Sequence, residues 1–206
     1  MATGRHFAPA IRSRAPDVRP QTHTRVWGLP NLSGRLVELS GGVSSACLTA
    51  AFGLVLEAQL SGVRAAWVAL EESSFFPPDA ADGGVDLDAL PVVRTPDARR
   101  AGRAADHLVR SGAFGLVVID LAADLLPTPL LARLHGLARR QDAAVLLLTK
   151  KAHDAPSLHP LISLRAEAQW RRREEQYELS VRVLKDKRGG PGWTYVEACR
   201  GPAGLR

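Results

Sequence analysis

Lysine, cysteine and long apolar runs are all scarce in this chain of 206 residues. Its cysteines, Cys47 and Cys199, lie far apart with no Cys-x-x-Cys pair or Cys/His cluster, which argues against structural zinc and a disulfide framework. No apolar run approaches the roughly 20 residues that cross a bilayer, and the first residues lack the apolar segment of a secretory signal. We therefore expect a cytoplasmic protein that needs no membrane, metal or cofactor.

The positive charge is almost all arginine, because lysine occurs only at positions 150, 151, 185 and 187, and it is unevenly placed. Residues 1–25 carry five arginines and one aspartate, whereas residues 26–150 carry eleven basic and thirteen acidic side chains. Residues 151–206 again have a basic excess, eleven against seven. An acidic body between two basic ends suggests an anionic partner, most often nucleic acid, and is compatible with a nucleoid-associated protein.

The length predicts one main domain. Residues 1–24 hold three prolines and four arginines with little apolar periodicity, which is typical of a flexible basic arm. We expect a single domain over residues 25–206.

Strand and helix patterns alternate along that domain. Strands are predicted at Arg35–Leu39, Arg64–Leu70, Phe114–Asp120 and Ala143–Thr149, and helices at Ser45–Leu60, Pro96–Ser111 and Pro129–Gln141. Asp79–Pro91 is predicted to be a loop. Period-2 strands follow at Leu164–Trp170, Tyr177–Leu184 and Trp193–Cys199. This order predicts an α/β fold, with a mostly parallel central sheet, helices on both faces and a C-terminal antiparallel hairpin extension.

A loop with the position of a phosphate-binding loop lies between the first strand and the first long helix. Such loops follow GxxxxGK[ST], in which glycines admit the phosphate, lysine neutralises it and the hydroxyl holds Mg²⁺. Gly41 matches the first glycine, but Ala46, Cys47 and Leu48 stand where the second glycine, the lysine and the hydroxyl residue belong. The full segment is Gly41, Gly42, Val43, Ser44, Ser45, Ala46, Cys47, Leu48 and Thr49.

These replacements predict a vestigial phosphate loop. No lysine precedes Lys150, so a nearby lysine cannot substitute for the missing one. Weak nucleotide binding and an ordinary Gly-Gly turn between strand and helix both remain open as present-day roles. We expect no hydrolysis and therefore no enzyme.

Several segments in order resemble the RecA recombinase core. They are GRLVELSGGVSSACLTAAF, RAAWVALEESSFF, the stretch from GVDLDAL to GLVVIDLAADLLP, and the late hairpin YELSVRVLKDKRGGPGWTYVEA. The resemblance covers about residues 26–200 and implies a RecA-like fold. It also implies that the usual N-terminal oligomerisation domain is replaced by the basic arm and that the C-terminal domain is absent.

The departures from the RecA pattern are similar to those of ImuA-like proteins. The region between Leu126 and Leu137, where a first DNA-binding loop belongs, is shortened, and a second is reduced to Lys151–His159. ImuA-like proteins accompany ImuB and a DnaE-type error-prone polymerase in damage-induced mutagenesis. The resemblance thus implies RecA, an ImuB-type protein, or both as partners, with possible weak DNA binding.

Single positions carry over from the RecA pattern. Glu71 aligns with the glutamate that activates water, and Asp120 with the aspartate that orients Mg²⁺; both are expected to be vestigial. Lys150 stands where the family has a glutamine that senses the γ-phosphate. Lys185 and Lys187 align with lysines that reach a neighbouring subunit's ATP, and Arg188 adjoins them, so these three are the expected partner interface.

Each of these residues also has an ordinary structural role open to it. Glu71 fits a solvated loop carboxylate, Asp120 fits a turn cap, and residues 185–188 fit a solvated charged turn. The four tryptophans are typical core or interface residues rather than platforms for bases.

The function expected from these patterns is a non-catalytic RecA-like accessory protein in SOS translesion mutagenesis. The alternatives are a divergent DNA-dependent ATPase, a DNA-binding module that uses the basic ends, and a SulA-like inhibitor of cell division. Binding to DNA through the basic ends would weaken steeply with salt, because phosphate contacts release counterions.

Overall fold

The computed structural model describes residues 26–42, 45–73, 75–122, 124–173 and 176–199. The expected basic arm, residues 1–24, lies outside the described residues, as do Val43 and Ser44 of the phosphate-loop segment.

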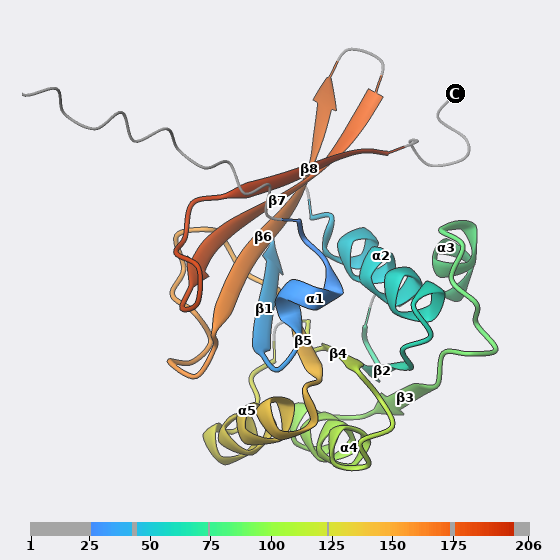
Figure 1. Ribbon diagram of the computed structural model, residues 1–206, viewed down its shortest axis with the longest axis vertical. Helices are drawn as coiled ribbons and strands as arrows, with labels where there is room; N and C mark the ends of the chain where they lie inside the picture. Colours follow the sequence, from blue (N-terminus) through green and yellow to red (C-terminus); the bar gives the residue numbers. More distant parts are fainter. Residues whose placement is uncertain (1–25, 43–44, 74, 123, 174–175, 200–206) are drawn as a thin grey trace, which may run out of the picture.

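The described residues form a single mixed sheet in the order β3-β2-β4-β5-β1-β6-β7-β8 (Figure 1). The strands are β1 (Leu36–Gly41), β2 (Ala65–Leu70), β3 (Val92–Thr95), β4 (Leu116–Asp120), β5 (Ala144–Lys150), β6 (Leu164–Arg173), β7 (Gln176–Asp186) and β8 (Thr194–Cys199). The first six strands in the chain pair in parallel, while β7 is antiparallel to both β6 and β8. The predicted mostly parallel sheet with an antiparallel C-terminal extension is confirmed.

Helices cover both faces of this sheet, as the sequence predicts (Figure 1). On one face lie α1 (Leu29–Leu32), α2 (Cys47–Leu60) and α3 (Pro77–Asp82), and on the other α4 (Ala98–Arg110) and α5 (Thr128–Gln141). Alternate residues of the strands feed the two cores: Val37 packs with the α2 side, whereas Leu36 packs with the α4 and α5 side. This alternation is the period of 2 that a strand imposes on its side chains.

Three short elements were not expected from the sequence, and the first of them is helix α1 (Leu29–Leu32). Helix α3 occupies Pro77–Asp82, so the prediction of a loop over Asp79–Pro91 is wrong at its start. Proline is favoured in the first turn of a helix, where its missing N–H costs nothing, and Asp79 adds a favourable acidic group there. Strand β3 has only four residues and forms the edge beside β2, which is too short for a clear periodic pattern.

Candidate functional site

The turn from β1 into α2 is packed tightly against the end of its own strand. A Cβ added to Gly41 would lie 2.2 Å from Ser45 Oγ and 2.9 Å from Cys47 Sγ. Position 41 therefore requires glycine, because contacts of that length do not occur between real side chains. The neighbouring Gly42 has open space around it, so only the first glycine of the pair is needed for packing.

Backbone donors at the start of α2 already have acceptors within the chain. The N–H of Ala46 donates to the carbonyl of Ala168 in β6 at 3.1 Å, and the N–H of Cys47 donates to Ser45 Oγ at 3.3 Å. An isolated bridge also joins Ser45 to Gln169. In a phosphate-binding loop the N–H groups at the helix start point to the ligand. Here the Ala46 N–H bonds to β6 instead, and the Cys47 N–H bonds to Ser45 within the turn.

Cys47, which the sequence pattern predicts to stand in place of the lysine of a phosphate loop, is only 7% exposed. Burial raises the pKa of its thiol to about 11; hydrogen bonds with Ser45 and Ala168 oppose this rise, and the charges of Asp120 and Glu167 add to it. The thiol is therefore neutral near pH 7. A neutral group beside two carboxylates provides no attraction for a phosphate.

Asp120 ends β4, and its carboxyl group is buried with 6% of the residue exposed. Burial raises its pKa, against hydrogen bonds from Ala122 and Ser73 and the charge of Lys150. Its Oδ1 accepts from the Ala122 N–H at 3.3 Å, while Oδ2 has no hydrogen-bond partner among the described residues. A carboxylate that orients Mg²⁺ needs an oxygen free of other bonds, and Oδ2 meets that requirement. Oδ1, in contrast, makes the turn-capping contact that is the ordinary structural role predicted for Asp120.

Glu71 and Lys150 lie at the same edge of the sheet as Asp120 and the α2 turn. Glu71 follows β2, is exposed, and donates its backbone N–H to the Thr95 carbonyl at 3.0 Å. Lys150 ends β5 and is also exposed. The carboxyl ends of neighbouring parallel strands meet at one edge, where ligands bind in such sheets, so the topology brings Glu71, Asp120 and Lys150 to the same edge as the α2 turn.

Of the predicted partner-interface residues, Lys187 and Arg188 lie near the opposite ends of the strands, whereas Lys185 is level with Glu38 in the middle of β1. In the sheet register, Asp186 pairs with Leu164 and Leu164 with Val37, at the start of β1 rather than its phosphate-loop end. Lys187 Nζ donates to the Pro160 carbonyl at 2.5 Å, and the Arg188 guanidinium donates to the Ser33 and Gly34 carbonyls at 3.1 Å. Lys185 is half-buried, and burial and the charge of Lys187 lower its pKa, with Glu38 opposing.

A buried ion pair holds this second edge in place. Arg35 Nη2 lies 2.5 Å from Asp186 Oδ1, with the two side chains 3% and 6% exposed. Burial acts to raise the pKa of Asp186, but hydrogen bonds from Arg35 and from the Arg188 backbone outweigh it, and the pKa is lowered. In the sequence, residues 185–188 form one charged run. In the structure the Asp186 side chain is buried, Lys185 is half-buried, and Lys187 and Arg188 are exposed.

A second buried charge, Glu38, was missed by sequence reasoning. It is fully buried in the middle of β1, with Lys151 Nζ 2.7 Å from Oε1 and the Leu158 N–H 2.9 Å from Oε2. Arg165 adds a bond from Nη2 to the Ala152 carbonyl at 2.9 Å. The segment predicted as a reduced second DNA loop, Lys151–His159, is therefore fastened to the sheet. A lone glutamate within the apolar run RLVEL is the signal that could have revealed this.

Comparison with known proteins gives matches to part of the chain. The family described as "RecA N-terminal domain" matches residues 21–144. The RecA protein of Kineococcus radiotolerans is 42% identical over 102 residues, which is 50% of this chain and 28% of that protein. The RecA protein of Salinispora tropica is 44% identical over a stretch with the same coverage. The match thus spans under a third of each relative's length.

No helix among the described residues is long and apolar enough to span a bilayer. Within the same part of the chain, no group of three or more His, Cys, Asp or Glu side chains is placed to hold a metal ion.

Proposed function

Because this chain belongs to the RecA family, we propose that it is a non-catalytic RecA-like accessory protein of SOS translesion mutagenesis. It acts through protein contacts with a RecA filament, with an ImuB-type polymerase-like partner that works with a DnaE-type polymerase, or with both. The chemistry of the phosphate-loop position carries the non-catalytic part of this proposal. The family match covers only the RecA N-terminal domain, so the mutagenesis role is supported by the resemblance to ImuA-like proteins.

The main support is the replacement of the family's lysine by Cys47. The thiol is neutral at pH 7 and lies near the carboxylates of Asp120 and Glu167. At an effective dielectric constant of about 20, a lysine about 4 Å from a phosphate charge contributes roughly 4 kcal/mol. Its absence alone costs about 1,000-fold in nucleotide affinity, before the N–H groups committed to Ala168 and Ser45 are considered.

The two edges of the sheet support a one-sided role in a filament. The edge with the vestigial loop would offer a neighbour no bound nucleotide, whereas Lys185 and Lys187 are retained, with Lys187 near the opposite ends of the strands. A subunit of this kind docks on one end of a RecA filament and donates these lysines to the ATP of the terminal RecA subunit. Docking must release Lys187 from the Pro160 carbonyl, which is a small cost for an exposed bond.

The test measures the DNA-dependent ATPase of RecA with increasing amounts of this protein. The wild-type chain is expected to change the rate, and Lys185→Ala/Lys187→Ala to remove the change. Arg64→Ala is the control, because Arg64 is exposed and immediately precedes β2, several strands away from β7 in the sheet. An unchanged effect of the double variant would refute the filament-end mechanism.

A pull-down from damaged cells separates the remaining alternatives. Capture of RecA or of an ImuB-type protein is expected. Capture of the tubulin-like division protein without either of these would support the SulA-like alternative instead.

A further inference from the structure

Arginine is concentrated on the two helices that cover one face of the sheet. Helices α4 and α5 together carry seven arginines and one acidic residue, Asp106. All seven are exposed: Arg99, Arg100, Arg103, Arg110, Arg133, Arg139 and Arg140. The segment of residues 26–150, which includes both helices, has a net acidic charge in the sequence. The positive charge gathered on α4 and α5 is therefore not apparent from the net charge of that segment.

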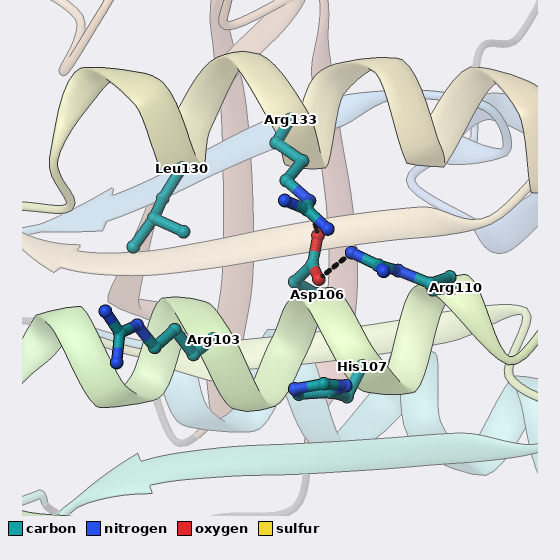
Figure 2. Close-up of a pocket in the computed structure, with 6 residues that line it drawn as sticks. All are labelled: Arg103, Asp106, His107, Arg110, Leu130 and Arg133. Atoms are coloured by element: carbon teal, nitrogen blue, oxygen red, sulfur yellow. Dashed lines mark hydrogen bonds and ion pairs between the residues drawn. The ribbon is translucent and has the colours of Figure 1, made fainter.

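An open cleft of about 490 Å³ lies between these helices (Figure 2). We call it the α4–α5 cleft; it is lined by Arg103, Asp106, His107, Arg110, Leu130 and Arg133. Arg110 Nη2 lies 2.5 Å from Asp106 Oδ2, and Arg133 Nε lies 2.5 Å from Oδ1. Figure 2 shows guanidinium groups from both helices converging on this one carboxylate.

The Asp106 carboxylate positions the guanidinium groups of Arg110 and Arg133 but does not cancel the positive charge of the cleft. Its side chain is only 7% exposed, whereas those of Arg110 and Arg133 are 47% and 53% exposed. Each guanidinium has five N–H donors in a rigid fork, so most donors of the two arginines remain available to solvent. The side chain of Arg103 forms no hydrogen bond or ion pair with another described residue, and it adds a third exposed cation to the lining of the cleft.

Two arginines of the same surface are placed against the preference of the helix itself. Arg99 and Arg100 lie in the first turn of α4, where the helix dipole disfavours a cation by about 0.3–1 kcal/mol. The N-cap Asp97 offsets part of this cost, because its carboxylate accepts from the Arg100 N–H at 2.7 Å and lies 3.8 Å from Arg100 Nε. Arg99 and Arg100 thus add exposed positive charge to the surface of α4 that also carries Arg103.

Features of the cleft favour protein carboxylates over nucleic acid. Neither α4 nor α5 contains Phe, Tyr or Trp, so these helices lack the large aromatic side chains on which bases most often stack. Leu130 supplies an apolar wall, and Asp106 already demonstrates how the arginines hold a carboxylate. We propose that the α4–α5 cleft docks an acidic segment of a partner protein that also carries an apolar side chain. This surface is independent of the nucleotide loop and goes beyond the function proposed above.

The test uses a fluorescein-labelled peptide of mixed Asp, Glu and Leu, and its Asn, Gln and Leu counterpart, in fluorescence anisotropy titrations. The full chain is expected to bind the acidic peptide and not the amide peptide. Arg103→Glu should weaken binding about tenfold or more, whereas Arg64→Glu, with the same change in net charge at another exposed site, should weaken it little. Leu130→Ala should weaken it further than the control does.

Three outcomes would overturn the proposal. They are no saturable binding of the acidic peptide, equal weakening by Arg103→Glu and Arg64→Glu, and displacement of the peptide by an equimolar single-stranded oligonucleotide. The last outcome would assign the cleft to nucleic acid. Arg99→Glu repeats the test at a second exposed site, so the result does not depend on one variant.

Discussion

Restoring the phosphate-loop residues should restore nucleotide binding if the missing cation is what prevents it. The change is Ala46→Gly/Cys47→Lys/Leu48→Thr, which supplies the second glycine, the lysine and the hydroxyl of the family pattern. Cys47 is 7% exposed and feels the charges of Asp120 and Glu167, so a lysine there gains two carboxylate neighbours. We expect the variant to fold, because the buried charge is compensated.

The gain in affinity follows from electrostatics. One lysine near a phosphate contributes roughly 4 kcal/mol at an effective dielectric constant of about 20, which is up to about 1,000-fold in Kd. The bond from the Ala46 N–H to the Ala168 carbonyl must break for full cradling of the phosphate, so the measured gain should fall below that limit.

The assay is calorimetric titration with Mg²⁺-ATP, and the control is the same triple change with methionine at position 47. Methionine fills similar volume without charge, so only the lysine variant should bind. Equal binding by the lysine and methionine variants, or tight binding by the wild-type chain, would refute the reasoning.

Three further predictions concern packing and buried charge. Gly41→Ala should destabilise the fold by about 1–3 kcal/mol in urea unfolding, because its Cβ would overlap neighbouring side chains, and Gly42→Ala should leave stability unchanged. With Cys199→Ser as background, alkylation of Cys47 by iodoacetamide should accelerate only as pH approaches about 11, and rapid alkylation at pH 8 would contradict the raised pKa. Because the pKa of the thiol is higher in the folded than in the unfolded chain, the folded state should also lose stability as pH rises from about 9 to 11. Glu38→Gln should cost about 3 kcal/mol, since it leaves the half-buried Lys151 and the buried Arg165 without their carboxylate; a cost under about 0.5 kcal/mol would show that these ion pairs do not stabilise the fold.

The order of strands and helices was predictable because it depends on local signals. The strand Phe114–Asp120 is an unbroken apolar run, and the helix Pro96–Ser111 has Asp97 as its N-cap, whose side chain accepts from the Arg100 N–H at 2.7 Å. The predicted loop over Asp79–Pro91 was wrong at its start because α3 spans only six residues, too few for a helical periodicity to show in the sequence, although Pro77 and Pro78 stand where a helix tolerates proline.

The candidate site was predictable only in part. Because parallel strands align their carboxyl ends, the positions of Asp120 and Lys150 at one edge followed from the predicted topology. The burial of Glu38 and the pairing of Arg35 with Asp186 did not follow, since each depends on partners more than 100 positions away in the chain. No periodicity in the sequence reports such a pairing.

The amino-acid sequence by itself determined the alternation of strands and helices, the resemblance to RecA and the absence of a lysine from the phosphate loop. Those properties depend on residue identity and on spacing within one or two elements. Only the tertiary structure decided that Lys187 lies near the ends of the strands opposite Cys47, and that Arg110 and Arg133 meet at Asp106. Strand register and helix packing set these positions, and both are properties of the folded chain.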